Sequence, residues 1–83
     1  MISIKKIRKN PDNQNWFTIS CKEILSKEFI REFQDKVNWY YVSLKQKLSE
    51  GFIVEFYQKI DFQTLLNNKD ISNETKEFCR MFL

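Results

Sequence analysis

NWFTISCKEILSKEFIREFQDKV, residues 15–37, is followed directly by NWYYVSLKQKLSEGFIVEFYQKI, residues 38–60. The two blocks are identical at 11 of 23 positions, and most of the other differences are conservative, as between Ile19 and Val42. Self-similarity at a fixed period of this length is typical of proteins built from stacked supersecondary units. This periodicity therefore decides the fold prediction for the whole chain.

The repeat extends in both directions, in weaker form. The third block, residues 61–83, has few identities but places Phe62 where the first two blocks have Trp16 and Trp39. Residues 1–14 resemble the second half of a block, with Ile2 in register with Leu25. We therefore predict one domain over residues 1–83, made of an N-terminal half-repeat at 1–14 and repeats at 15–37, 38–60 and 61–83.

Each block carries the start signals of two helices. Asn15, Asn38 and Asp61 are suited to cap a first helix, because their side chains accept a hydrogen bond from an amide that the helix leaves unpaired. Ser26 and Ser49 stand where a second helix begins, followed by apolar residues at helical spacing. With no glycine to end it, the second helix is expected to be the longer one and to run to the next Asn or Asp. The predicted fold class is all-α, a short stack of about three and a half helix-pair units.

The N-terminal segment has two interpretations. Ser3 to Asn10 reads as a capped helix that Pro11 would stop, because proline cannot continue a helix. Ile2, Ser3 and Ile4 also alternate as a short strand does. The match to the later serine-capped helices favours the helix.

Composition narrows the function classes. The 83 residues include no histidine, which removes the commonest general base and metal ligand. Cys21 and Cys79 lie far apart without spaced partners, as free thiols do. We therefore predict no catalytic site, metal or cofactor. No apolar run reaches the length of a membrane span, so we expect a cytoplasmic protein without membrane contact.

The repeat also resembles families of tandem short-helix repeat proteins that are encoded mainly by large DNA viruses and some phages. Their units look like W-x-x-I-S … L-S-x-x-F-I-x-E-F-x-x-K-V, and a related unit reads I-T-I-E-x-I-x-x-N-P-D … N-W-x-x-I-S. Residues 2–60 are similar to these units, whereas residues 61–83 match them poorly. The residues of the second block that match are Trp39, Val42, Ser43, Leu48, Ser49, Phe52, Ile53, Glu55, Phe56, Lys59 and Ile60. The resemblance implies a helical repeat of viral or phage origin and carries no catalytic residue.

The leading functional hypothesis is a non-enzymatic protein-binding module. Given the resemblance, its expected partner is a host protein, for example an antiviral defence component such as a CRISPR effector, which it would inhibit in the host cytoplasm. Function is expected where the copies differ, since the repeat does not require those residues. The predicted protein-contact residues are Tyr40, Tyr41, Tyr57, Phe82 and Leu83. Tyr40 and Tyr41 have an equally supported alternative role, extending the core between neighbouring units, and the apolar C-terminus predicts a homodimer.

The alternative hypothesis is a nucleic-acid-binding accessory protein. The net charge of +3 is concentrated at the N-terminus, and the rest of the chain, with ten basic and eleven acidic side chains, is nearly neutral. A basic patch of this kind holds phosphates with salt-dependent affinity, or is simply the solvated face of the first helix. The residues that would contact nucleic acid are Lys5, Lys6, Arg8 and Lys9.

Overall fold

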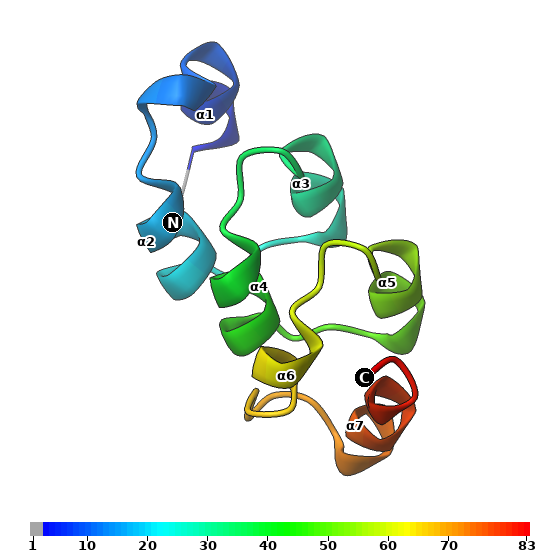
Figure 1. Cartoon of the computed structure of the whole chain (residues 1–83). Helices are drawn as coiled ribbons and strands as arrows, with labels where there is room; N and C mark the ends of the chain where they lie inside the picture. Colours follow the sequence, from blue (N-terminus) through cyan, green and yellow to red (C-terminus); the bar gives the residue numbers. More distant parts are fainter. Residues whose placement is uncertain (1–2) are drawn as a thin grey trace.

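The computed structural model describes residues 3–83, which form seven short α-helices, one 3-10 helix and no strand (Figure 1). The prediction of an all-α protein is therefore confirmed. The elements in chain order are α1 (Ile4–Lys9), η1 (Pro11–Asn13), α2 (Trp16–Lys22), α3 (Lys27–Glu32), α4 (Trp39–Lys45), α5 (Glu50–Glu55), α6 (Phe62–Leu65) and α7 (Asn73–Arg80).

The predicted cap residues begin the helices. The Oδ1 atom of Asn15 accepts a hydrogen bond from the Thr18 amide at 3.1 Å, and the Oγ atom of Ser26 accepts one from the Phe29 amide at 3.1 Å. The same contact starts the later helices, at Asn38, Ser49, Asp61 and Ser72. Ser3 caps α1, so the helical interpretation of the N-terminal segment is confirmed; Ile2 lies outside the described residues.

The expectation that the second helix of each block is the longer one was wrong for the first two blocks and right for the third, where α7 has eight residues and α6 has four. Helices α3 and α5 have six residues each, whereas α2 and α4 have seven. Helix α3 ends at Glu32, and the amides of Lys36 and Val37 both donate to the Phe33 carbonyl in a turn. The turn exposes the carbonyl of Gln34, which accepts the indole N–H of Trp39 at 2.8 Å. A contact from the next helix therefore accompanies the end of α3. Residues 33–37 themselves contain no residue that marks the end of a helix in the sequence.

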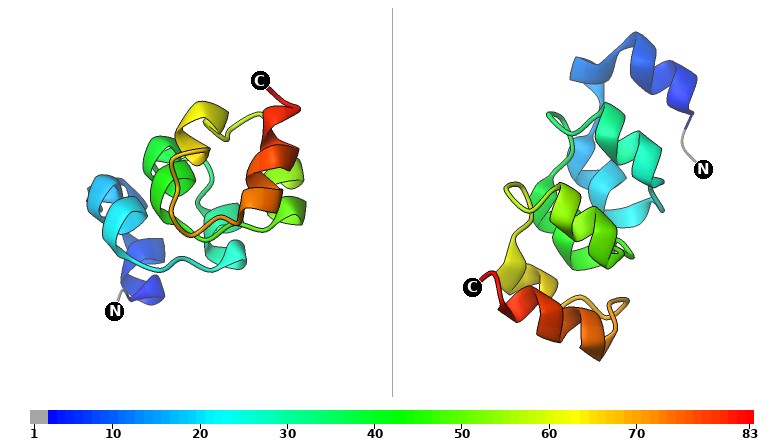
Figure 2. Two further views of the ribbon diagram at one scale, coloured as in Figure 1. Left: turned by 90° about the horizontal axis from the view of Figure 1, so that it is seen from below. Right: turned by 90° about the vertical axis from the view of Figure 1, so that its right-hand side faces the viewer.

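The helices follow one another along an elongated molecule of 39 × 20 × 16 Å. Helices α2, α4 and α6, which we call the first row, run down one side, and α3, α5 and α7 run down the other (Figure 1). The views in Figure 2 show the chain advancing from α1 at one end to α7 at the opposite end. The buried apolar residues form one core cluster to which both sides contribute, including Ile30, Val42, Ile53 and Leu65.

Contacts between neighbouring segments recur at the interval of the sequence repeat. The amide of Asn38 donates to Ser20 Oγ at 2.8 Å, and at the equivalent positions of the next block the amide of Asp61 donates to Ser43 Oγ at 3.0 Å. The serine hydroxyls are fully buried and serve as acceptors for the next helix start. Equivalent residues in the sequence therefore make equivalent contacts, and these contacts fix how α4 lies on α2 and α6 on α4.

Candidate protein-binding surface

Three aromatic side chains form a partly exposed cluster on the first row. The rings of Phe17 and Tyr41 meet edge to face with centroids 4.6 Å apart, and those of Tyr40 and Tyr41 do so at 4.9 Å. Phe17 and Tyr40 each keep 50% of their surface exposed, and Tyr41 is half-buried between them. We call these three residues the aromatic patch.

The aromatic patch arises from the packing of α4 against α2. Phe17 and Tyr40 occupy equivalent positions of the two helices, and Tyr41 reaches back to the ring of Phe17. In α6 the corresponding positions hold Gln63 and Thr64. Tyr41 thus bridges neighbouring helices, as its alternative role required, while Tyr40 faces solvent. Helix α6 packs on α4 without an aromatic at either of these positions.

The other predicted protein-contact residues lie on different helices. Phe82 stacks on Phe62 with centroids 4.9 Å apart and an interplanar angle of 11°, and Tyr57 lies 6.4 Å from Phe82. Phe78 completes this C-terminal cluster. Leu83 is 61% exposed and Phe82 is 41% exposed. The structure therefore brings Tyr57 together with Phe82 and separates this pair from Tyr40 and Tyr41.

The basic residues of α1 differ in their environment. Arg8 donates two hydrogen bonds to the carboxylate of Glu32, from Nε at 2.6 Å and from Nη2 at 2.8 Å. These bonds raise the pKa of Arg8 and hold the pKa of Glu32 below its ordinary value. Lys5, Lys6 and Lys9 are exposed and form no ion pair with any residue from 3 to 83. Three of the four predicted phosphate contacts are therefore unpaired cations.

Two buried amides were not predicted from the sequence. Gln46, 5% exposed, donates from Nε2 to the carbonyls of Ser20 at 2.9 Å and Glu23 at 2.7 Å, and its Oε1 accepts the Leu25 amide. Asn68, fully buried, donates in the same way to two carbonyls of α4 and its C-cap. Both stand in segments that the sequence presents as polar linkers. Gln46 and Asn68 are separated in sequence by one residue fewer than the repeat length, so the alignment of the blocks does not place them at equivalent positions.

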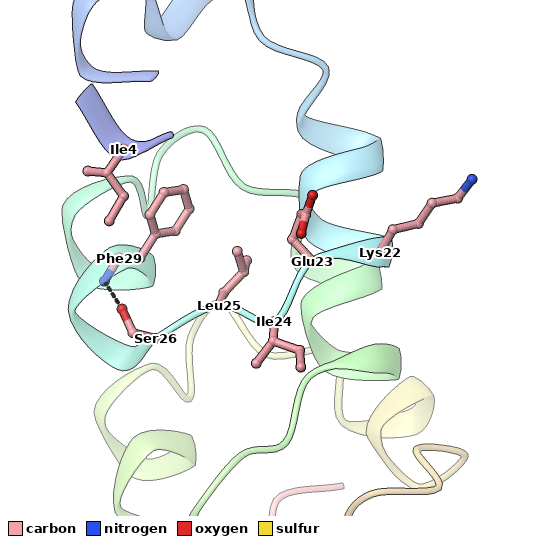
Figure 3. Close-up of a pocket in the computed structure, with 7 residues that line it drawn as sticks. All are labelled: Ile4, Lys22, Glu23, Ile24, Leu25, Ser26 and Phe29. Atoms are coloured by element: carbon pink, nitrogen blue, oxygen red, sulfur yellow. Dashed lines mark hydrogen bonds between the residues drawn. The ribbon is translucent and has the colours of Figure 1, made fainter. Parts of the chain in front are cut away.

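A shallow groove opens at the N-terminal end of the molecule. It has a volume of about 460 Å³ and lies between α1, the end of α2 and α3 (Figure 3). Ile4, Leu25 and Phe29 supply its apolar lining, and Ile24 beside them is 97% exposed. Lys22 stands at the rim, and Figure 3 shows its side chain pointing away from the groove. The lining is mostly apolar and includes one carboxylate, that of Glu23.

The described residues hold no arrangement of three or more acidic or cysteine side chains that could bind a metal ion. Cys21 is half-buried and Cys79 is buried, and both are free thiols. Burial raises the pKa of the Cys79 thiol, and the negative charge of Glu50 adds to this effect. Within residues 3–83, no helix has the length and apolar character needed to cross a membrane.

No protein-family model, no curated protein and no solved structure matches this chain. The arguments for function therefore rest on the geometry and chemistry of the surfaces described above.

Proposed function

We propose that this chain is a small protein-binding module that uses the aromatic patch as its docking surface. The observation that carries the proposal is the exposed edge-to-face cluster of Phe17, Tyr40 and Tyr41 on packed helices. Aromatic rings, tyrosine above all, are enriched at protein interfaces because they bury a large area at a small entropic cost. Here the neighbouring rings already restrict one another, so these side chains lose little conformational freedom when a partner binds.

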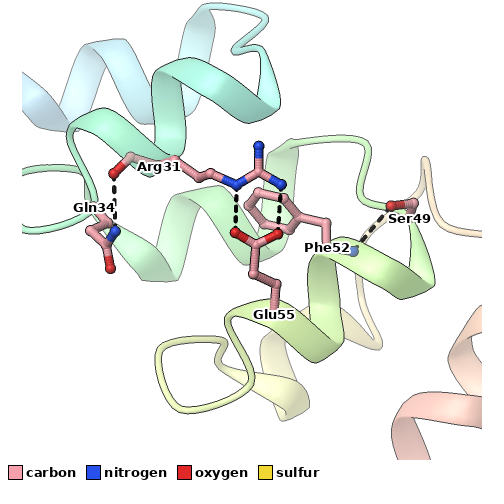
Figure 4. Close-up of polar contacts among 5 residues, drawn as sticks. All are labelled: Arg31, Gln34, Ser49, Phe52 and Glu55. Atoms are coloured by element: carbon pink, nitrogen blue, oxygen red, sulfur yellow. Dashed lines mark hydrogen bonds and ion pairs between the residues drawn. The ribbon is translucent and has the colours of Figure 1, made fainter.

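We further propose that the scaffold is a short stack of helix-pair repeats, in about three and a half units. Ion pairs between successive blocks support this arrangement. Arg8 pairs with Glu32 of the following block, and Arg31 pairs in the same way with Glu55 (Figure 4). Repeat arrays present extended surfaces to partners because each unit contacts only its neighbours. The aromatic patch, which spans two neighbouring helices of the first row, fits such a use.

The partner that we propose is a host protein, in keeping with the resemblance to viral and phage repeat families, and the module would act by blocking an antiviral defence component. Affinity capture from a host lysate tests this. The tagged wild-type chain should retain one protein in stoichiometric amount, and Tyr40→Gln with Tyr41→Thr should lose it. These substitutions copy Gln63 and Thr64, which stand at the equivalent positions of α6, and the circular dichroism spectrum of the variant should match that of the wild-type chain.

A matched control is Ile24→Lys, which removes a different exposed apolar side chain and copies Lys47 of the next block. This variant should retain the partner fully. Capture of no stoichiometric protein by the wild-type chain, or equal capture by the tyrosine variant, would overturn the proposal.

Nucleic-acid binding through α1 is the second candidate, and the three unpaired lysines of that helix favour it. It predicts binding that weakens steeply with salt, because each phosphate contact releases counterions. Replacing Lys5, Lys6 and Lys9 by Ala should then abolish retention of a labelled DNA or RNA oligonucleotide. Retention that survives this change would remove the second candidate.

Self-association is a separate proposal that rests on the C-terminal cluster. Met81 is 80% exposed beside the partly exposed Phe82 and Leu83. Apolar surface of this kind favours contact with a second copy. Light scattering at high protein concentration should give the mass of a dimer, and Phe82→Ser should return it to that of a monomer. A monomeric mass for the wild-type chain at such concentrations would exclude the dimer.

A further inference from the structure

Helix α1 buries less apolar surface than α3 or α5 do. Its sequence, IKKIRK, contains no aromatic residue, and Ile7 is its one buried side chain. Helices α3 and α5 each bury a Phe and an Ile. The ring of Trp16 also packs on Phe29, with centroids 6.1 Å apart, and so joins α3 to α2. The rings of Trp39 and Phe52 join α5 to α4 in the same way. Apolar packing therefore holds α1 less firmly than it holds α3 and α5.

The sequence of α1 would not form a stable helix on its own. The helix has six residues, fewer than the ~12–15 that an isolated helix needs in water. Four of the six are cations, and Lys5 and Lys9 stand four positions apart, where like charges repel. Its first turn contains no acidic residue that would complement the helix dipole. The helical state of residues 4–9 therefore depends on the surface against which α1 packs.

Glu32 supplies the ion pair that joins α1 to α3. Its carboxylate accepts two hydrogen bonds from Arg8, at 2.6 and 2.8 Å, in the paired geometry that makes such contacts strong. The pair also neutralises one of the four cations of α1. The equivalent pair of Arg31 and Glu55 joins α3 to α5, which are held by their tryptophan contacts as well. Loss of the ion pair is therefore expected to release α1 but to leave α3 and α5 in place.

Helix α1 also forms one side of the apolar groove at this end of the molecule. Ile4 lies beside Phe29 in Figure 3, and both line the groove together with Leu25. The 3-10 helix η1, which follows α1, is tied to α2 because the Trp16 indole donates to the Pro11 carbonyl at 2.7 Å. The chain can therefore open between α1 and η1 while everything after this point stays in place.

We infer that α1 is a detachable strap, held on α3 by Ile7 and the ion pair of Arg8 with Glu32, and that its release opens the apolar groove. This inference does not depend on the proposed protein-binding function. In the attached state, these two contacts keep residues 4–9 helical. In the released state, these residues lose the helix, and the side of the groove that Ile4 forms is removed. The strap thus controls how much apolar surface this end of the molecule exposes.

The Cα chemical shifts of the full chain report helix at each residue and test the inference. Glu32→Lys sets a cation against Arg8 and should lower the helical shifts of residues 4–9 by at least about half, because like charges in contact repel strongly. Adding Arg8→Glu should restore these shifts. The matched control, Glu55→Lys, makes the same change at the equivalent position of the next block. It should leave α3 and α5 as helical as in the wild-type chain.

Binding of Nile red, an uncharged dye, is a second measurement that the altered charges do not affect directly. Its fluorescence should increase at least about twofold with Glu32→Lys, since the dye binds apolar surface that release exposes. It should return to the wild-type level when Arg8→Glu is added, and Glu55→Lys should leave it unchanged.

The opposite outcomes are equally defined. Wild-type shifts for residues 4–9 in Glu32→Lys overturn the inference, and so does a failure of Arg8→Glu to restore them. Loss of helical shifts throughout the chain also overturns it, because α1 would then not be separable from the rest. Equal loss of helix in α5 with Glu55→Lys would show that α1 has no special attachment. Release without an increase in dye fluorescence would show that α1 does not control the groove.

Discussion

The guanidinium group of Arg31 faces the carboxylate of Glu55, in the following block, in two parallel hydrogen bonds (Figure 4). The Nε–Oε2 distance is 2.5 Å and the Nη2–Oε1 distance is 2.7 Å. Such a paired geometry is selective for arginine, because lysine cannot donate two parallel bonds. Arg8 and Glu32 form the same pair one block earlier.

Exchanging the charges of this pair tests whether it couples neighbouring blocks. Arg31→Glu alone sets two carboxylates against each other and should lower the urea midpoint of unfolding. Combining it with Glu55→Arg should recover most of the loss. The difference in urea midpoint between the single and the double variant should be smaller in high salt, since both side chains are exposed and dissolved ions screen their charges. If the urea midpoint of the double variant falls by the sum of the losses in the two single variants, the pair contributes nothing to stability. Lys47→Glu, which changes an exposed lysine that has no ion pair among residues 3–83, is the control for charge alone.

The ion pairs also predict a dependence of stability on pH. Hydrogen bonds from Arg8 and Arg31 hold the pKa values of Glu32 and Glu55 below the ordinary value. A carboxyl group with a lower pKa in the folded state contributes its full stabilisation above the unfolded value of about 4.3. The contribution is lost as the pH falls further, through the lowered folded values.

Thermal unfolding between pH 7 and pH 2.5 measures this effect. The wild-type melting temperature should fall with pH in that acid range. The Glu32→Gln, Glu55→Gln double variant should be less stable at pH 7 and should lose less on acidification. Parallel curves for the two proteins would contradict the assignment of acid sensitivity to these carboxylates.

Gln46 is expected to be the polar side chain whose loss costs most. Its amide group satisfies two carbonyls and one amide of the backbone between Ser20 and Leu25. Gln46→Leu leaves these groups without a partner and should lower the free energy of unfolding by about 2–3 kcal/mol. Denaturant titration measures the loss. Gln63→Leu, on the exposed surface of α6, should change it by less than about 0.5 kcal/mol; a similar cost in both variants would contradict the role of Gln46.

Gly51 offers a substitution that should stabilise the protein. It lies inside α5, and a Cβ atom built there meets no atom within 4 Å. Alanine has a higher helix propensity and restricts the unfolded chain more, so Gly51→Ala should raise the free energy of unfolding by about 0.4–1 kcal/mol. A lower melting temperature for this variant would refute the expectation. Glu, the residue of the equivalent position 28, should also be tolerated there.

The helix starts could be predicted from the sequence because a helix cap depends only on residues that are close together in the sequence. Asn15 and Ser26 each bond an amide in the first turn of the helix that follows, and that spacing is visible in the sequence. The end of α3 could not be predicted in this way. It coincides with a contact from the Trp39 indole to the Gln34 carbonyl, in the next block. Gln46 and Asn68 were missed for a related reason, since each bonds the backbone of the preceding block.

The candidate site was predicted in part. Comparison of the copies pointed to Tyr40 and Tyr41, which the structure places together. It did not select Phe17, although this residue stands at the position of Tyr40 in the first copy. It also grouped Tyr57 with the other tyrosines, whereas the structure places it beside Phe82.

The contacts between blocks have a consequence for how fast the chain finds its structure. The ion pairs and hydrogen bonds that join different blocks connect neighbours in the sequence repeat, as between Asn38 and Ser20 or Gln46 and Ser20. When contacting residues are close in sequence, little conformational entropy is lost in closing the loop between them, and such chains fold quickly. In the proposed stack of repeats, folding is expected to begin at any adjacent pair of blocks and to spread outward. The terminal helices then exchange their amide hydrogens sooner than α4, which has neighbours on both sides.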